Sequence, residues 1–253
     1  MMFIDTHAHY DDSAFDGDRD VLLSSFPSKG IEKIVVPGCD IPSSLAALEL
    51  AGKYGYIFAA CGIHPENLPD DAEEALKELE KILEHPKCVA VGEIGLDYYW
   101  DKSRKEEQKD IFRRQLILAK KADLPVIIHD RDAHADSFDI VSEYPGLRGV
   151  FHCYSGSAEM AAELLKRGWY LGFDGPVTYK NARKIVEVIE ICPLEKILIE
   201  TDSPYLSPVP MRGKRNDSSN LRYVAERIAD IKGLPVEEIA ARTSENAAEL
   251  FGF

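Results

Sequence analysis

The sequence predicts an α/β fold of the TIM type, a (β/α)8 barrel of parallel strands with one helix appended at its C-terminal end. Three observations carry this prediction. Eight short apolar runs alternate with amphipathic helical stretches along the whole chain. The runs are apolar at consecutive positions, which is typical of strands buried on both faces of a parallel sheet. The length of 253 residues agrees with the roughly 250 that one such barrel needs, so we expect a single domain over residues 1–253.

The expected strands are short and rich in Val, Ile or aromatic residues. They are Met2–Ile4, Lys33–Val36, Ile57–Ala60, Cys88–Val91, Pro125–Ile128, Gly149–Phe151, Trp169–Gly172 and Ile197–Ile199. A helical pattern follows each of them, and this order indicates a parallel α/β sheet. After the first run comes Asp-Thr-His-Ala-His instead of the Gly-rich phosphate turn of an open doubly wound sheet, which favours a closed barrel.

The expected helices carry apolar side chains at helical spacing. In Asp71–Leu83, the residues on one stripe are Ala72, Ala75, Leu76, Leu79 and Leu83. In Lys105–Ala122, the inward residues are Ile111, Leu116, Leu118 and Ala119. The other expected helices lie near Arg19–Ser28, Ser43–Lys53, Ala133–Glu143, Ala158–Arg167, Ala182–Glu190 and Asn220–Ile231, and Val236–Phe251 is the appended one. The longest irregular segment, Ser203–Gly213, follows the last strand and is a candidate active-site loop.

Composition limits the class of protein. The 30 Lys and Arg against 44 Asp and Glu give a net charge of −14, which argues against a chain-wide basic surface for duplex DNA but not against a local basic groove. Five scattered Cys without a CxxC pair indicate reduced thiols. No run has the length of a membrane span, and the first residues lack the apolar core of a signal peptide. We therefore expect a cytoplasmic monomer with no membrane association and no obligate protein partner.

Metal-binding side chains recur at the carboxyl ends of the expected strands. The side chains at these ends are His7, His9, Glu93, His129, His152 and Asp202. Active sites of (β/α)8 barrels are built at that face from several strand ends. Residues two apart in extended backbone point to the same side, so both imidazoles of the His-Ala-His segment would reach one ion. A single such pair is often incidental. Here, however, four of the seven His residues in the chain lie at expected strand ends, and together they predict a metal site.

The same six residues suggest two ions in one centre. A carboxylate such as Glu93 can bridge two ions, His129 and His152 would complete the shell of one, and Asp202 that of the other. Two neighbouring ions would share a hydroxide and stabilise an oxyanion.

The chain resembles the TatD-like metal-dependent hydrolases, often described as TatD deoxyribonucleases, of the amidohydrolase superfamily. The resemblance covers essentially the whole chain. Its motifs are FIDTHAHYDD at 3–12, GIHPE at 62–66, VGEIGLDYYW at 91–100, IIHDRDAH at 127–134, FHCYSG at 151–156, ETDSPYL at 200–206 and RGKRND at 212–217. The family fold is a (β/α) barrel, in agreement with the strand count.

The resemblance implies a ligand set and an activity. His7, His9, Glu93 and Asp202 would hold one divalent ion, and Glu93, His129 and His152 the other. Asp202 would also accept a proton from the metal-bound water, so Asp202 and Glu93 are the expected catalytic residues. The implied reaction is phosphodiester hydrolysis of DNA, of the 3′ exonuclease type on single strands or 3′ ends. The ligand types suit Mg, Mn, Zn, Fe or Ni, so the identity of the two ions stays open.

Residues near these ligands are candidates for substrate binding. The set comprises His64, Arg131, Tyr154, Arg212, Lys214 and Arg215. His64 would contact a phosphate or a ligand, or else make a structural hydrogen bond in its loop. The basic residues would line a phosphate path, or else form solvated loop charge. Aromatic residues in the same segments would stack on bases or else pack in the fold; they are Tyr98, Tyr99, Trp100, Tyr154 and Tyr205. For Asp97, a helix- or turn-capping role is the simpler interpretation.

Two alternative functions are compatible with these residues. One is a binuclear metal hydrolase of a small amide, ester or lactone; many such enzymes use a carboxylated Lys as the bridge, where this chain has Glu93. The other is a barrel that binds nucleic acid without catalysis, which an intact ligand set argues against.

Overall fold

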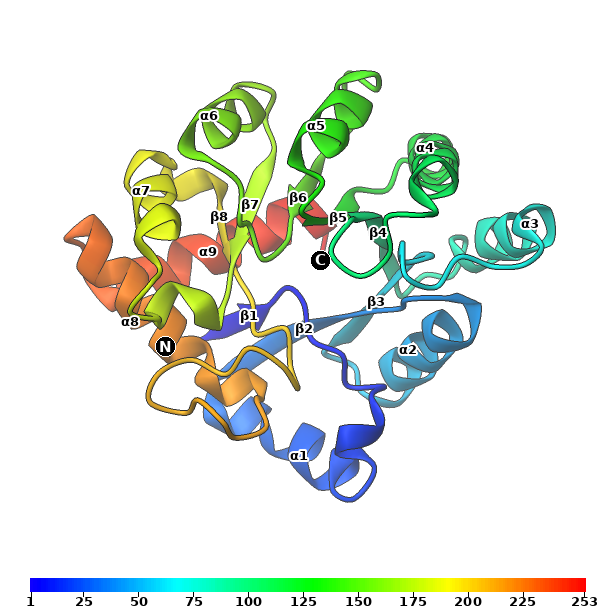
Figure 1. Cartoon of the computed structure of the whole chain (residues 1–253). Coiled ribbons are helices and arrows are strands. Elements are labelled where there is room, and N and C mark those ends of the chain that lie inside the picture. The colour runs from blue at the N-terminus through cyan, green and yellow to red at the C-terminus, as the bar shows by residue number, and fades with distance from the viewer. The chain divides into compact units, whose positions relative to one another are not determined.

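The computed structural model describes residues 1–253, and strand and helix alternate along them in the predicted order (Figure 1). The strands are β1 Phe3–Asp5, β2 Ile31–Pro37, β3 Ile57–Cys61, β4 Cys88–Asp97, β5 Val126–Arg131, β6 Gly149–Phe151, β7 Tyr170–Phe173 and β8 Ile197–Ile199. They belong to one sheet in which they follow one another from β1 to β8. The pairings β1–β2, β3–β4, β4–β5, β5–β6 and β7–β8 are parallel. Strand order and alternation are those of a (β/α)8 barrel, which confirms the predicted fold class.

One helix follows each strand, and a ninth ends the chain. The helices are α1 Arg19–Ser25, α2 Ile41–Lys53, α3 Ala72–Ile82, α4 Lys105–Ala122, α5 His134–Ser142, α6 Ala158–Lys166, α7 Arg183–Ile191, α8 Leu221–Lys232 and α9 Val236–Phe251. Short 3-10 turns lie at Ser13–Phe15, Pro27–Lys29, Gly175–Thr178, Leu194–Lys196 and Ser218–Asn220. No helix combines the length and apolar character that a membrane span requires. All five cysteines are free thiols.

Local sequence explains where the helices begin. Asp40 and Ser43 form a capping box at the start of α2, and the Asp71 carboxylate accepts from the Glu74 backbone N–H at the start of α3. Such caps satisfy the first N–H groups of a helix, which have no partner within it. The predicted apolar stripe of α3 is buried at Leu76 and Leu79.

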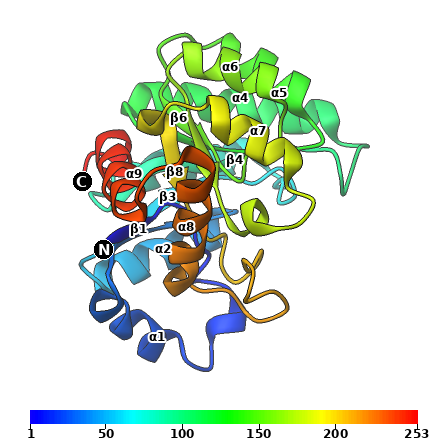
Figure 2. The ribbon, with the colours of Figure 1, turned by 90° about the vertical axis from the view of Figure 1, so that its left-hand side faces the viewer.

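The chain divides into two compact units. The terminal unit comprises Met1–Val36 and Cys153–Phe253, and the central unit comprises Pro37–His152. Within the terminal unit, α9 packs against α8, β1 and β8 (Figure 2). Each unit supplies its own share of the predicted site residues and is described separately below.

In the central unit, β4 is longer than predicted. The sequence indicated Cys88–Val91, whereas the strand continues to Asp97 with all ten residues buried. The β4–β5 register shifts between Val91 and Ile94, and the Gly92–Glu93 peptide bond is cis. Gly95 has a φ of 143° and lies so close to the His129 carbonyl that a Cβ atom would collide with it. Gly92 and Gly95 thus allow β4 to continue past Val91, where the apolar pattern predicted the end of the strand. Glu93 therefore lies within β4.

Candidate metal centre

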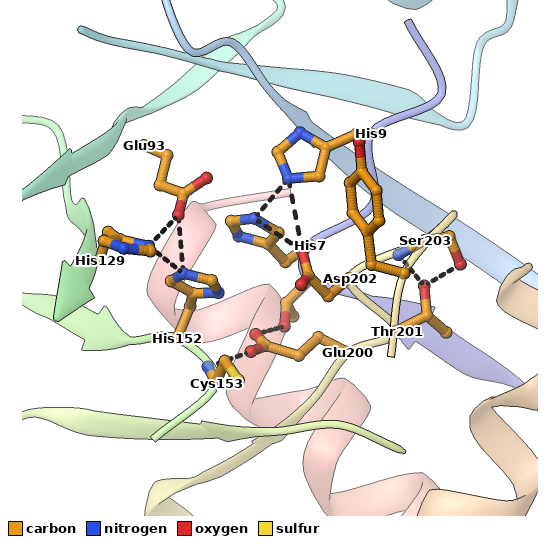
Figure 3. Close-up of polar contacts among 12 residues, drawn as sticks. His7, His9, Glu93, His129, His152, Cys153, Glu200, Thr201, Asp202 and Ser203 are labelled. Carbon is orange, nitrogen blue, oxygen red and sulfur yellow. Dashed lines mark hydrogen bonds and ion pairs between the residues drawn. The ribbon is translucent and has the colours of Figure 1, made fainter. Parts of the chain in front are cut away.

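Three predicted ligands of the terminal unit converge on one point. His7 Nε2 lies 3.2 Å from His9 Nε2 (Figure 3). Asp202 Oδ1 lies 3.4 Å from His9 Nε2 and 3.7 Å from His7 Nε2. The His7 side chain is fully buried, whereas those of His9 and Asp202 retain a little exposure. We call these three residues the terminal cluster.

Backbone hydrogen bonds between the ends of β1 and β8 hold the terminal cluster. Asp202 N–H donates to the His7 carbonyl at 2.9 Å, and His9 N–H donates to the Ser203 carbonyl at 2.7 Å. Asp202 has a φ of 54°, a left-handed conformation that Asp tolerates better than most residues. These contacts join the last strand to the first, as a closed (β/α)8 barrel requires, and they bring ligands from both ends of the chain together.

Below this cluster lies a buried hydrogen-bond network centred on Asp5. The Asp5 carboxyl group accepts from Thr201 Oγ1 at 2.7 Å and from Ser218 Oγ at 2.6 Å, and also from the Thr201 backbone N–H. Burial raises the pKa of Asp5 to about 7, against the lowering effect of these hydrogen bonds. Tyr10 accepts from the Ser218 backbone N–H at 2.8 Å and extends the network toward the start of the chain. The network fixes Asp5, two residues before His7, and Thr201, which directly precedes Asp202.

Glu200 is a second buried carboxylate of the terminal unit, and sequence reasoning missed it. Its Oε1 accepts from the Cys153 backbone N–H (Figure 3). Its Oε2 accepts from Thr6 Oγ1 at 3.3 Å. A Cβ atom at Gly172 would collide with the Glu200 carboxylate, which explains the glycine there. Cys153 itself has a φ of 43° and directly follows His152 in sequence. Burial raises the pKa of its thiol well above the usual range, which agrees with a structural rather than a nucleophilic role.

Three predicted ligands also converge within the central unit. Glu93 Oε1 lies 2.8 Å from His129 Nδ1 and 2.7 Å from His152 Nε2, and the two ring nitrogens are 3.2 Å apart (Figure 3). Glu93 and His152 are buried. We call Glu93, His129 and His152 the central cluster.

Asp97 holds the His129 ring from the other side. Asp97 Oδ2 lies 3.0 Å from His129 Nε2, while Oδ1 accepts from the backbone N–H groups of Tyr99 and Trp100 at 2.8 and 3.2 Å. Burial alone would raise the pKa of Asp97, but its hydrogen bonds with His129 and those N–H groups lower it to about 2. Burial alone would lower the pKa of His129, yet its hydrogen bonds to Asp97 and Glu93 raise it. The predicted capping role of Asp97 is present, and its contact with His129 was missed.

His64 joins the central cluster. Its Nε2 lies 3.6 Å from Glu93 Oε1, and its Nδ1 accepts from the Glu66 backbone N–H at 3.2 Å. The rings of His64 and His129 meet edge to face with centroids 4.3 Å apart. Burial, followed by the charge of His129, lowers the pKa of His64 and favours its neutral form. The loop after β3 therefore supplies a neutral imidazole beside the central cluster.

The spacing of the ligand atoms fits divalent ions. With metal–ligand bonds of about 2.1 Å, two ligand atoms of a tetrahedral ion are about 3.4 Å apart. The terminal cluster has separations of 3.2, 3.4 and 3.7 Å, and the central cluster has separations of 2.7, 2.8 and 3.2 Å. Each cluster combines two imidazoles with one carboxylate, a set suited to Zn, Mn, Fe or Ni. In both clusters two imidazole nitrogens face each other, and a cation between them would satisfy both.

The remaining predicted substrate residues differ in their surroundings. Tyr154 is buried and its hydroxyl donates to the Ser157 carbonyl. Arg215 forms a two-pronged ion pair with Asp18 at 2.7 and 2.8 Å. Arg212 stacks on the Tyr179 ring with its guanidinium 4.1 Å from the centroid, whereas Lys214 is exposed. Packing and pairing account for Tyr154 and Arg215, and substrate contacts by all these residues stay predictions.

The whole chain is similar to known metal-dependent hydrolases. The family described as TatD related DNase matches residues 4–252. The Bacillus subtilis protein named uncharacterized metal-dependent hydrolase YabD is 47% identical over 252 residues, which cover 99% of both chains. YcfH of Escherichia coli, with a similar description, is 36% identical over 99% of this chain and 96% of its own.

A solved structure shares the fold as well as the sequence. The crystal structure of YjjV, a TatD homologue from Escherichia coli, superposes with a TM-score of 0.93 at 35% identity. The match covers 99% of this chain and 98% of that one. Both ligand clusters lie within the matched region.

Proposed function

The chain belongs to the TatD family of metal-dependent hydrolases, and on this premise we propose that it is a two-metal deoxyribonuclease that removes nucleotides from the 3′ ends of single-stranded DNA. The observation that carries the proposal is the convergence of His7 Nε2, His9 Nε2 and Asp202 Oδ1 within 3.7 Å of one another. The family supplies the reaction class, and the ligand types supply the chemistry.

In this proposal the terminal cluster would hold one ion and the central cluster would hold another. Active sites of (β/α)8 barrels are built from residues of several strands and their ends, which supports a catalytic role for ions held there. Two divalent ions held there would polarise the phosphodiester and favour deprotonation of a water molecule.

The side chains of the protein would then orient the phosphate and move protons. Asp202 keeps some exposure, with its side chain 15% accessible, so a water molecule can approach its carboxylate. Asp202 would accept a proton from that water as the water oxygen bonds to phosphorus. The P–O bond to the leaving sugar oxygen would break, and that oxygen would take up a proton to leave as an alcohol. The neutral His64 is suited to donate a hydrogen bond to a phosphate oxygen, because a neutral imidazole keeps one N–H group.

The net charge of −14 is compatible with this activity. Phosphate binding needs positive potential only where the phosphate lies, and bound cations are often the largest local charges in a site. The ions and a few exposed basic residues, such as Lys214 and Arg131, would supply that potential.

The proposal is tested with purified protein and a 5′-labelled single-stranded oligonucleotide in Mg²⁺, Mn²⁺ or Zn²⁺. We expect stepwise shortening from the 3′ end that stops when a chelator removes the metal. Asp202→Asn should slow cleavage by about 10²- to 10⁴-fold, as loss of a general base does. Asp139→Asn removes an exposed carboxylate of α5 and should cleave as wild type does. Absence of cleavage with every metal would overturn the deoxyribonuclease assignment, and wild-type rates in Asp202→Asn would overturn the role of that residue.

A further inference from the structure

We propose that Tyr99, Trp100 and Arg131 form a stacking site for an unpaired base of the nucleic-acid strand whose phosphate the central cluster binds. This inference rests on the proposed function and adds to it a base-binding subsite. Tyr99 and Trp100 are large aromatic side chains, yet they are 52% and 66% exposed. The neighbouring Tyr98 is buried, and its hydroxyl donates to Asp136. Of the three consecutive aromatic residues, only the last two are therefore exposed to solvent.

The three side chains are arranged as one surface, which we call the aromatic platform. The rings of Tyr99 and Trp100 meet edge to face with centroids 4.9 Å apart. The guanidinium of Arg131 lies 4.0 Å from the Tyr99 centroid and 5.5 Å from that of Trp100. Arg131 is exposed, and its charge favours the ionised form of the carboxyl group of the exposed Glu66. Exposed aromatic faces beside an exposed guanidinium match a base with its attached phosphate, because the rings stack on the base and the cation attracts the phosphate.

The backbone ties this platform to the central cluster. In the β4–β5 pairing, Gly95 lies opposite His129, and Asp97 lies opposite Arg131. Arg131 thus follows His129 by two strand residues, or roughly 6.6 Å. Asp97 accepts from the N–H groups of Tyr99 and Trp100 with one oxygen and contacts His129 with the other. One carboxylate therefore positions both a proposed metal ligand and the two exposed rings, which sets the platform within reach of a base attached to the bound phosphate.

Local charge favours a nucleic-acid strand over an apolar partner. Lys105, at the start of α4, lies over the Tyr98 ring at 3.9 Å, and Lys102 is exposed in the loop between β4 and α4. The acidic Asp101 is engaged by the backbone and hydroxyl of Ser103. An apolar peptide would desolvate the Arg131 charge without supplying a hydrogen-bond acceptor, which is costly, whereas a phosphate would pair with it.

The chain contains its own reporter for this site. It has two tryptophans, of which Trp169 is only 3% exposed and Trp100 is 66% exposed. Stacking of a base on Trp100 should quench the exposed part of the tryptophan fluorescence. The experiment titrates the metal-loaded protein with a phosphorothioate octathymidylate, which resists hydrolysis, and in parallel with an abasic octamer of the same backbone.

We expect saturable quenching by the octathymidylate and little by the abasic strand. The Trp100 variants lack this reporter, so their binding is measured by the anisotropy of a fluorescently labelled octathymidylate. Trp100→Ala should weaken octathymidylate binding on the order of tenfold, because base–aromatic stacking contributes about 1–3 kcal/mol per base. Trp100→Phe should retain most of the affinity, and Arg131→Gln should weaken both strands. Ile117→Ala, which removes a 53% exposed apolar side chain from α4, is the matched control and should bind as wild type does.

The outcomes separate this inference from the proposed function. If an unmodified strand is cleaved, but the octathymidylate quenches no more than the abasic strand and Trp100→Ala binds normally, the aromatic platform is wrong and the nuclease stands. If no metal supports cleavage while the octathymidylate still quenches Trp100, the platform stands as a base-binding site and the nuclease is wrong.

Discussion

Asp97 Oδ2 contacts His129 Nε2 at 3.0 Å, and the opposite ring nitrogen, Nδ1, faces Glu93 Oε1 at 2.8 Å. A carboxylate on one ring nitrogen keeps the proton there and leaves the other nitrogen with its lone pair, as a metal ligand requires. The chain thus sets the tautomer of His129 through a residue that is not itself a proposed ligand.

Asp97→Asn should therefore weaken metal binding while preserving the loop. The Asn oxygen can still accept from the Tyr99 N–H, but its NH2 group would face His129 Nε2 and shift the ring proton to Nδ1. Loss of such a partner typically costs 10- to 100-fold in metal affinity. Calorimetric titration with Mn²⁺ or Zn²⁺ measures the metal affinity. As a control, Asp101→Asn, four residues further along, should bind metal as wild type does. Equal affinities in the two variants would exclude this role for Asp97.

Gly95→Ala should disrupt the central cluster. The new Cβ would collide with the His129 carbonyl, and the φ of 143° is one that side chains rarely adopt. We expect a clear loss of thermal stability together with loss of metal binding. Thermal melts with and without Zn²⁺ measure both effects. Gly52→Ala is the opposite case, because Gly52 lies in α2 with nothing within 4 Å of the new Cβ. It should raise stability by up to about 1 kcal/mol, since Ala favours helix over Gly.

Leu79→Ala should destabilise the protein without changing its chemistry. Leu79 is fully buried in α3, and removal of such a side chain costs about 2–5 kcal/mol. Chemical denaturation measures the loss, and cleavage per folded molecule should equal that of wild type. Lys77→Ala, at an exposed position of the same helix, should change stability by no more than about 0.5 kcal/mol.

The ion pair between Arg215 and Asp18 should give a pH-dependent contribution to stability. Hydrogen bonds from Arg215 lower the pKa of Asp18 from its ordinary value of 3.8. A carboxyl group with a lowered pKa in the folded state adds stability above its unfolded pKa and loses it as the pH falls through the folded pKa. The Tm of wild type should exceed that of Asp18→Asn by a constant amount from pH 7 to about pH 5. The difference should shrink below pH 3.8 and also shrink in high salt. A difference that grows toward acid pH would contradict this account.

Much of the fold was predictable because consecutive apolar residues and helical stripes report burial directly. The strand β4 shows where that signal fails. Its apolar run ends at Val91, and only the strand pairing carries Glu93 and Asp97 into the sheet. The ligand clusters were predictable from their positions at strand ends, whereas the partners of those ligands were not. Glu200 and Asp97 carry no local pattern that names their contacts, although Asp97 lies four residues after Glu93, on the same side of an extended strand.

Arg215 shows the limit of a motif. The basic segment 212–217 predicted phosphate contacts, but the Arg215 guanidinium lies against Asp18. Asp18 belongs to the N-terminal part of the chain, and no sequence spacing links the two residues. The two arginines therefore differ in their surroundings: Arg215 forms a direct ion pair with Asp18, whereas the exposed Arg131 acts on Glu66 through its charge, and phosphate contacts by either residue stay a prediction.

The hydrogen bonds between the ends of β1 and β8 have a consequence for biosynthesis. His7 leaves the ribosome 195 residues before Asp202, whereas all three residues of the central cluster precede β7. A nascent chain therefore contains every residue of the central cluster long before Asp202 completes the terminal cluster. A truncated translation product that stops before β8 therefore lacks Asp202 and cannot form the complete terminal cluster.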